Sequence, residues 1–350
     1  MNTEPFTING IAVKPGTRTT IDLPAGRLYT HAPMTIPVHV IAGKRAGPCL
    51  FLSAAIHGDE INGVEIIRRV LKLPALKRLK GTVLAVPIVN VHGLISHSRY
   101  LPDRRDLNRS FPGTEKGSLA ARLAHLFMTE IVAKSTHGID LHTGAIHRSN
   151  LPQIRANLDD DETNRMARAF QAPVIISSNL RDGSLRESAS EFGIPTLLYE
   201  AGEALRFDEV GIRAGVKGIV NVMRLLGMLP ATRTKPKRQT DPVVARSSSW
   251  VRAPSSGILR AMVPLGGRVK NGTLLGIVAD PFGEREAEIT ATFSGIVIGR
   301  TNLPLVNEGD ALYHIARFED IKEIEAKVDE FQEEHSPEPI SAPHSESPII

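Results

Sequence analysis

Two short motifs carry residues of the kind that bind a catalytic metal ion. In the first, His57-Gly58-Asp59-Glu60 follows an apolar run and precedes a segment of helical periodicity. Because His57 and Glu60 stand three residues apart across such a turn, an imidazole nitrogen and a carboxylate oxygen can reach one Zn²⁺. The alternative is that Asp59 or Glu60 only caps the helix N-terminus and that His57 is an ordinary loop histidine.

The second motif, Asp140-Leu141-His142-Thr143-Gly144, also ends a strand-like run. A catalytic zinc takes three protein ligands and leaves one position open for water, and His142 would complete a set of two histidines and one glutamate. Asp140, two residues back along a strand, can face the same way and accept a hydrogen bond from an imidazole. The alternative is that His142 is a buried histidine without a metal, whose imidazole only forms a hydrogen bond with Asp140. With Cys49 as the single cysteine, a metal site must use histidines and carboxylates.

A third motif, Asp106-Leu107-Asn108-Arg109, is preceded by Arg99. A guanidinium presents a fork of donors that matches a carboxylate, so Asn108 and Arg109 are candidates for binding a substrate carboxylate. Arg99 is the candidate for stabilising the oxyanion that develops on the scissile carbonyl. Arg104 and Arg105 compete with Arg99 for this role, and a surface salt bridge is the alternative for any of these arginines.

Glu200 ends the apolar run Thr196-Leu197-Leu198-Tyr199. A carboxylate delivered by a buried strand into a partly desolvated site can take a proton from metal-activated water and pass it to a leaving amine. We therefore expect Glu200 to be the general base, with Glu203 as the second choice. The alternative is a strand-end glutamate in water.

The elements that must position these residues predict an α/β fold. Short apolar runs alternate with helix-period segments up to Leu229, which is typical of a mixed, largely parallel sheet sandwiched by helices. Polar residues at strand carboxyl ends are where ligands bind in such sheets. The predicted strands are 49–56, 82–89, 138–142, 173–177 and 195–200, and the predicted helices contain the apolar positions 61–71, 119–131 and 216–226.

A different composition begins after Leu229, where Gly-punctuated strands without helical periodicity follow a segment rich in Pro, Lys and Arg. Ser256-Gly257-Ile258-Leu259 recurs as Ser294-Gly295-Ile296-Val297, which predicts a small quasi-symmetric β-barrel or sandwich. It resembles the lipoyl/biotinyl-carrier fold, but the turn at 280–285 offers no lysine to modify. We expect an N-terminal β segment (1–45), a zinc hydrolase domain with α/β architecture (46–230), a linker (231–242), this β module (243–318) and a charged helix with a disordered tail (319–350).

Composition and charge exclude several classes of protein. The chain is 41% hydrophobic and 23% charged, within the globular range, and its net charge is +4. Its one basic cluster, 233–238, has no aromatic residues for stacking on bases, so it predicts a solvated linker and no nucleic-acid partner. Neither a signal peptide nor a long apolar span is present, so we expect a cytoplasmic protein without membrane contact. The sequence leaves homo-oligomerisation open.

Taken in order, the motifs HGDE, DLNR, DLHTG and the glutamate after an apolar strand resemble the succinylglutamate desuccinylase/aspartoacylase family, a branch of the zinc carboxypeptidase superfamily. The resemblance covers about residues 45–230. It implies a zinc carboxypeptidase-like fold, one Zn²⁺ per chain, and the same site residues and roles as above. The implied activity is hydrolysis of an amide bond in an N-acyl amino acid or similar small acidic amide.

Two other functions stay open at this point. A zinc carboxypeptidase acting on peptides would use the same metal and the same carboxylate-binding residues. A β module packed far from His57 would favour that peptidase, because in deacylases of this kind the module can narrow the access to the active site. The third hypothesis is an inactive relative that keeps the fold and binds a ligand.

Overall fold

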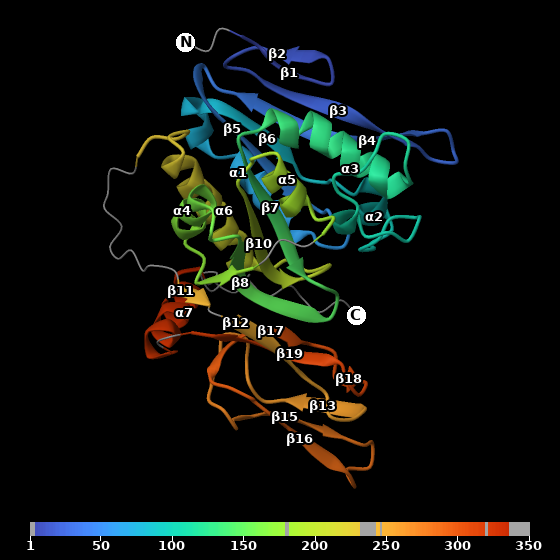
Figure 1. The fold of residues 1–350 in the computed structure, drawn as a ribbon, viewed down its shortest axis with the longest axis vertical. Helices are drawn as coiled ribbons and strands as arrows, with labels where there is room; N and C mark the ends of the chain where they lie inside the picture. The colour runs from blue at the N-terminus through green and yellow to red at the C-terminus, as the bar shows by residue number, and fades with distance from the viewer. Residues whose placement is uncertain (1–3, 179–181, 232–242, 246, 319–320, 336–350) are drawn as a thin grey trace, which may run out of the picture.

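The computed structural model of the chain describes residues 4–178, 182–231, 243–245, 247–318 and 321–335. Figure 1 shows a larger body of strands and helices and a smaller body of strands formed by the carboxy-terminal part of the chain. The predicted linker, with its basic cluster, lies outside the described residues except for Ala231. The predicted disordered tail after His335 also lies outside them.

A large mixed sheet runs through both bodies in the strand order β12-β19-β17-β8-β10-β7-β5-β6-β4-β3, and β9, β11 and β14 pair at its side. Its central strands are parallel, and those on both flanks are antiparallel to their neighbours. The predicted mixed α/β sheet is therefore confirmed. The parallel strands are β6 (Lys80–Val86), β5 (Arg45–Ala54), β7 (His137–Gly144) and β10 (Thr196–Glu203).

One strand in the middle of the sheet, β8 (Arg148–Ala156), is not among the strands that the sequence predicts. Its sequence, RSNLPQIRA, contains a proline and five polar side chains, so it lacks both the continuous apolar run and strict alternation. It pairs with β10 on one side and with β17 on the other. Beside it, β9 (Val174–Ser177) was expected at 173–177.

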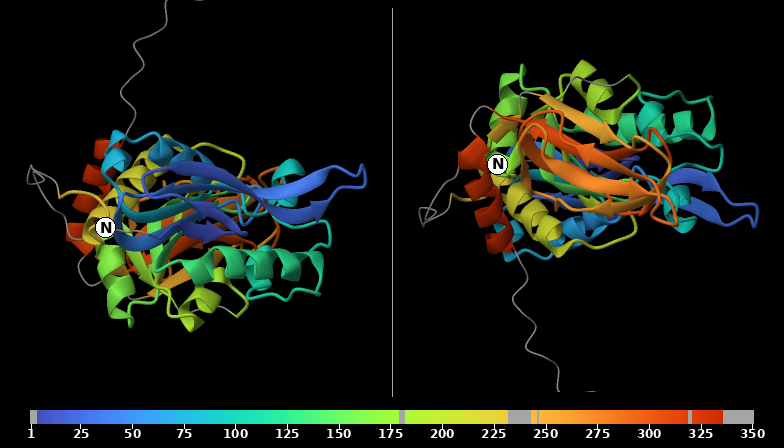
Figure 2. Two further views of the ribbon diagram at one scale, coloured as in Figure 1. Left: turned by 90° about the horizontal axis from the view of Figure 1, so that it is seen from above. Right: turned by 90° about the horizontal axis from the view of Figure 1, so that it is seen from below.

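Both faces of the central strands are covered by helices, as their apolar runs predict. Along β5, Leu50 and Leu52 pack into one layer and Phe51 into the other. Figure 2 shows α1 and α3 on opposite sides of the strands. The first layer contains α1 (Asn62–Leu71), α4 (Asp161–Phe170) and α6 (Glu209–Leu225), and the second contains α3 (Leu119–Glu130) and α5 (Leu185–Glu191). Short helices are η1 (Pro74–Arg78), α2 (Val91–Ile95), η2 (Leu107–Arg109) and η3 (Val132–Lys134).

The amino-terminal residues form two hairpins. β1 (Phe6–Ile8) pairs with β2 (Ile11–Val13), and β3 (Arg18–Arg27) pairs with β4 (Pro33–Ala42). Because β4 also pairs with β6, this segment extends the central sheet. In β3 the apolar side chains of Ile21 and Leu23 are buried in the layer that holds α3, and their neighbours are exposed.

The carboxy-terminal strands form a β sandwich. A separate sheet in the order β16-β15-β13-β18 packs against the end of the large sheet that holds β12, β19, β17 and β14, around a core that includes Leu259, Leu275, Val297 and Leu312. The repeated halves exchange strands, because β14 of the first half pairs with β17 of the second and β18 of the second pairs with β13 of the first. The strands are β11 (Val243–Ala245), β12 (Ser247–Arg252), β13 (Gly257–Ala261), β14 (Arg268–Val269), β15 (Leu274–Ala279), β16 (Glu286–Thr290), β17 (Gly295–Thr301), β18 (Leu305–Val306) and β19 (Ala311–Arg317).

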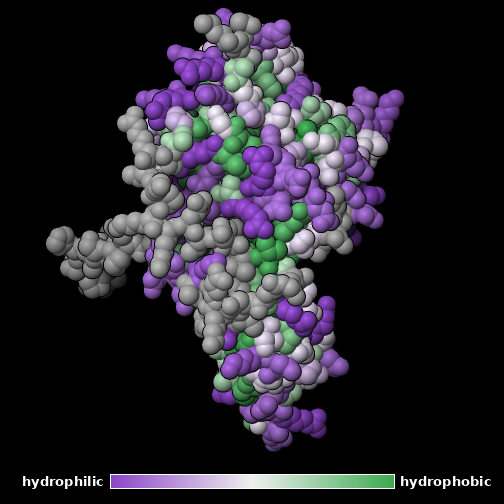
Figure 3. All heavy atoms as spheres, turned by 60° about the vertical axis from the view of Figure 1, so that its left-hand side comes forward, coloured by the Kyte–Doolittle hydropathy of each residue, from purple (hydrophilic) through white to green (hydrophobic). Residues whose placement is uncertain are grey.

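This sandwich is continuous with the sheet of the larger body, since β17 pairs directly with β8. The expected domain boundaries stay predictions, because strands from both flanking regions belong to one sheet. Figure 3 shows that polar side chains cover much of the visible face of the larger body and that the molecule narrows toward the β sandwich.

The chain ends, within the described residues, in α7 (Ile321–His335), which packs on α6 where Lys217 and Glu334 form an ion pair of 2.6 Å. A charged helix was expected at 319–334. None of the helices in the described part of the chain is long and apolar enough to cross a membrane.

Candidate metal centre and active site

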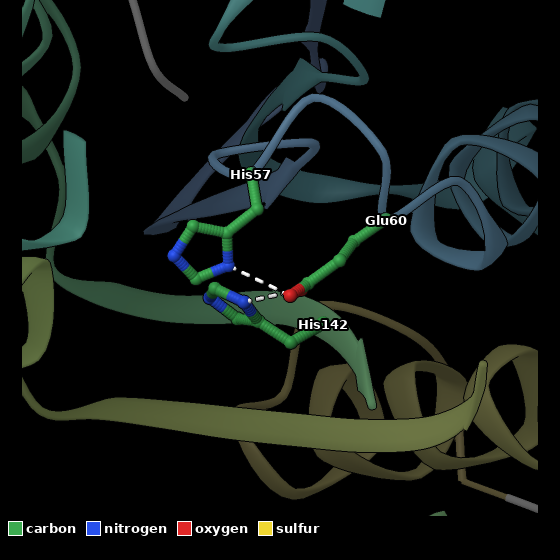
Figure 4. A group of neighbouring side chains, drawn as sticks. All are labelled: His57, Glu60 and His142. Atoms are coloured by element: carbon green, nitrogen blue, oxygen red, sulfur yellow. Dashed lines mark hydrogen bonds and ion pairs between the residues drawn. The ribbon is translucent and has the colours of Figure 1, made fainter. Parts of the chain in front are cut away.

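Three buried side chains from separate elements converge on one point. His57 lies in the turn after β5, Glu60 lies just before α1, and His142 is on β7. Nδ1 of His57 is 2.8 Å from Oε1 of Glu60, and Nδ1 of His142 is 2.7 Å from Oε2. Figure 4 shows both imidazoles turned toward this carboxylate. One donor atom from each of the three residues lies within 4.8 Å of the other two, so the group could hold a metal ion.

Each imidazole is held at its other nitrogen by a second carboxylate. Nε2 of His142 is 2.7 Å from Oδ2 of Asp140, whose Oδ1 accepts a 2.7 Å hydrogen bond from Ser53. Nε2 of His57 is 3.1 Å from Oδ1 of Asp106. Such partners fix the orientation of a ligating histidine. The sequence predicts Asp140 in this position but misses Asp106, which lies far from His57 along the chain.

The turn that carries His57 requires close packing against α2. A Cβ atom at Gly58 would lie 2.0 Å from the backbone carbon of Gly93, so only glycine fits there. Glu60 donates its backbone N–H to the carbonyl of His57 at 3.1 Å, which closes the turn. The spacing of His57 and Glu60 is thus fixed by backbone contacts.

The charges around this point favour a bound cation. Burial alone would raise the pKa of Glu60, but the nearby imidazoles hold that pKa well below its ordinary value. Burial alone would lower the pKa of His142, but Asp140 and Glu60 raise that pKa well above its ordinary value. Buried carboxylates need positive charge beside them, which protonated imidazoles or a divalent cation can supply. The donor set of two imidazoles and one carboxylate fits zinc.

Glu200 stands next to His142 across the sheet, because the two residues are paired in the parallel register of β10 and β7. Its Oε2 accepts hydrogen bonds from Asn150 at 2.8 Å and Gln153 at 3.2 Å, and lies 3.2 Å from Nε of Arg155. All three partners belong to β8. Glu203, the second choice for the base, instead bonds the backbone N–H of His147 and the amide of Asn302.

The predicted ligand-binding residues lie on the segment between α2 and α3. Arg99 forms ion pairs with Glu60 at 3.2 Å and Asp106 at 2.9 Å. The side-chain oxygen of Asn108 accepts from the backbone N–H of Leu185, which leaves its amide group as the donor. Arg109 is exposed and donates to the carbonyl of Asn108.

Arg104 and Arg105, which compete with Arg99 in the sequence, are exposed and do not line the site. Arg105 lies 3.9 Å from Asp103 instead.

All eight predicted site residues border one cavity of about 320 Å³. The sequence misses further polar residues of its wall, since they come from the unpredicted strand β8, from the segment before α5 and α5 itself, and from the carboxy-terminal sandwich. Their only signal in the sequence is that β8 carries polar residues inside an otherwise apolar region. The missed residues include Arg148, Asn150, Arg155, Ser178, Ser184, Arg186 and Trp250.

Comparison with known families identifies the class of protein. Residues 46–226 match the succinylglutamate desuccinylase/aspartoacylase catalytic domain, so the chain belongs to this family. The family expected from the motifs is thereby confirmed. A curated relative, the N-alpha-acetyl-L-2,4-diaminobutyric acid deacetylase of Halomonas elongata, is 29% identical over 292 residues, which cover 80% of this chain and 85% of the relative.

Solved structures share the fold over most of this chain. A succinylglutamate desuccinylase/aspartoacylase from Rhodobacter sphaeroides is 26% identical, with a TM-score of 0.76 over 86% of this chain and 96% of its own. The product-bound ectoine utilization protein EutE (DoeB) of Ruegeria pomeroyi has a TM-score of 0.78 at 24% identity, over 89% and 99% of the two chains. At 24% identity, the similarity to the Ruegeria pomeroyi protein concerns the fold alone.

Proposed function

We propose that this protein is a zinc-dependent deacylase that hydrolyses the amide bond of an N-acyl amino acid or a similar small acidic amide. The observation that carries the proposal is the register of β7 and β10, which sets Glu200 beside a group of three donors suited to a metal ion. The curated relative from Halomonas elongata is named as a deacetylase of an N-acetyl amino acid, which agrees with this chemistry.

In this proposal His57, Glu60 and His142 hold the zinc ion. Bound there, zinc would polarise the scissile carbonyl. It would also lower the pKa of a water molecule, so that this water could lose a proton and act as the nucleophile at neutral pH. Glu200 takes the proton of the attacking water and passes it to the leaving amine. Arg99, fixed by Asp106, offers positive charge to the carbonyl oxygen as negative charge develops there.

Asn108 and Arg109 bind the carboxylate of the substrate in this proposal. The Asn108 amide is oriented because its oxygen is already used by Leu185, so its N–H groups can donate to a ligand. Arg109 has no carboxylate partner among the described residues, so its guanidinium is available to bind a ligand carboxylate.

A small amide is favoured over a peptide because the carboxy-terminal sandwich reaches the cavity. Trp250, on β12 of that sandwich, lines the same cavity as His57 and Glu200. A module packed far from His57 would have favoured a carboxypeptidase. Here the module instead contributes Trp250 to the cavity that His57 lines.

The proposal is tested by assaying N-acetyl and N-succinyl amino acids and short peptides, with and without a chelator. We expect turnover of at least one N-acyl amino acid that is lost on chelation and restored by zinc. Cleavage of peptides alone would indicate the carboxypeptidase, and binding without turnover would indicate the inactive relative.

A further inference from the structure

Arg148, at the start of β8, is a cation of the cavity wall that lacks a carboxylate partner. No hydrogen bond or ion pair joins its guanidinium to another residue in the described ranges, and its side chain is half-buried. Burial lowers the pKa of Arg148, Asp310 raises it and Arg252 lowers it. A half-buried guanidinium without a hydrogen-bonding partner is unusual, because burying its charge costs free energy.

The position of Arg148 is set by an aromatic ring from the carboxy-terminal sandwich. Its guanidinium carbon lies 4.5 Å from the ring centre of Trp250. Trp250 in turn stacks on the imidazole of His314 at 4.6 Å and an angle of 10°. These two residues are paired in the register of β12 and β19, so the imidazole of His314 supports the indole ring of Trp250. A guanidinium stacked on an aromatic face keeps its N–H groups available in the plane of the fork.

The ring of Trp250 extends over a glycine of the sheet. Gly299 on β17 lies between β19 and β8, and the edge of the Trp250 ring would be 3.5 Å from a Cβ atom placed there. The same Cβ atom would lie 2.9 Å from Oδ1 of Asn150 and 3.1 Å from Cβ of His314. A larger side chain at this position would therefore fill the space over which the ring extends.

The other arginines of the cavity are occupied differently. Arg99 is paired with Glu60 and Asp106, Arg155 with Glu200, and Arg186 donates to Ser178. Neither Arg109 nor Arg148, both in this wall, has a carboxylate partner among the described residues. Two such cations in one cavity suit a ligand with two anionic groups.

We propose that Trp250 positions Arg148 as the binding group for a second anionic group of the substrate, distinct from the carboxylate assigned to Asn108 and Arg109. The inference rests on the proposed function for the reaction itself. It makes Trp250 a positioning residue that acts through Arg148, and it makes the carboxy-terminal sandwich a part of the specificity site.

The test compares substrates that differ only by a carboxylate or a carboxamide. The pairs are N-acetylaspartate with N-acetylasparagine, and N-succinylglycine with N-succinamoylglycine, so that the second anion is varied on either side of the amide. In the wild type, kcat/KM should favour the carboxylate member of at least one pair. Arg148→Gln should lower that preference about tenfold or more, which is the scale of a charge-assisted hydrogen bond.

Two further substitutions separate positioning from general damage. Trp250→Leu should lower the same preference, mainly through KM, and Trp250→Phe should retain part of it because a ring remains. Arg260→Gln, an exposed charge on β13 of the same sandwich, is the matched control and should leave the preference within about twofold. If Trp250 had a purely structural role, its substitution would lower kcat/KM equally for both substrates of a pair. That result would overturn the inference.

Binding without catalysis distinguishes this inference from the proposed function. Calorimetry with glutarate and with glutaramate should show tighter binding of glutarate to the wild type and loss of that difference in Arg148→Gln. If this is observed but no amide is hydrolysed, the proposed function alone fails. If amides are hydrolysed but neither pair shows a preference that Arg148→Gln removes, the inference is overturned and the proposed function stands.

Discussion

Oδ1 of Asp106 lies 3.1 Å from Nε2 of His57, at the ring nitrogen opposite the one that faces Glu60. The same arrangement joins Asp140 to His142 at 2.7 Å. Both imidazoles are therefore held between two carboxylates. This geometry presents Nδ1 of each ring to the same point and explains how loops and strands far apart in the chain can form one rigid site.

Loss of either outer carboxylate should weaken metal binding without removing a ligand. We expect Asp106→Asn and Asp140→Asn each to lower zinc affinity about 10- to 100-fold, because the imidazole loses its orienting acceptor. Competition with a chromophoric chelator measures this. Asp22→Asn, an exposed aspartate on β3, is the control and should bind zinc as the wild type does. Unchanged affinity in both site variants would mean that these carboxylates do not support the ligands.

Glu200→Gln should abolish most turnover while zinc stays bound. The amide keeps the shape and a hydrogen-bonding oxygen for Asn150 but cannot accept the proton, so kcat should fall by about two to four orders of magnitude. The matched control is Glu203→Gln, whose carboxylate bonds His147 and Asn302. If kcat falls in the Glu203 variant and not in the Glu200 variant, the base has been assigned to the wrong glutamate.

The strand β7 offers an internal comparison of two histidines. His142→Ala removes a proposed ligand and should reduce bound zinc from one ion per chain to a small fraction. His137→Ala, at the other end of β7 and 3.5 Å from Glu162, should keep the full amount. Elemental analysis of the dialysed proteins gives both values. Full zinc content in the His142 variant would exclude this residue as a ligand.

His314 predicts a pH dependence of stability. Burial, with Arg155 and Arg148 nearby, lowers its pKa to about 3 in the folded protein, compared with about 6.5 in the unfolded chain. Between these values the unfolded chain binds a proton that the folded protein does not, so stability falls as the pH drops below 6.5. At pH 5 this group should cost about 2 kcal/mol.

The comparison that isolates this effect is His314→Phe, which keeps a ring behind Trp250 and cannot titrate. Urea unfolding at pH 7.5 and pH 5 should show a smaller loss of stability in the variant than in the wild type. Parallel losses in the two proteins would show that His314 is not buried in its neutral form.

The sequence predicts the part of the site that lies at strand ends of the larger body. His57, Glu60 and His142 follow apolar runs, and their positions depend on local turns and on the parallel register of neighbouring strands. Glu200 is predictable for the same reason. The strand order itself is not visible in the sequence, yet the rule that ligands lie at strand carboxyl ends is enough to bring these four residues together.

The remaining wall of the cavity could not be predicted, because it depends on contacts between distant segments. Trp250 lies at the cavity because β17 pairs with β8, which joins the carboxy-terminal sandwich to the sheet of the larger body. Arg148 and Arg155 belong to a strand whose polar residues hide its secondary structure. Asp106 stands in a predicted motif, but only the three-dimensional structure brings it next to His57.

Anomalous diffraction at the zinc absorption edge, from crystals grown with zinc, tests the central claim most directly. We expect one strong peak per chain, within bonding distance of His57, Glu60 and His142. A strong peak elsewhere, or none between these three side chains at full zinc saturation, would contradict the account.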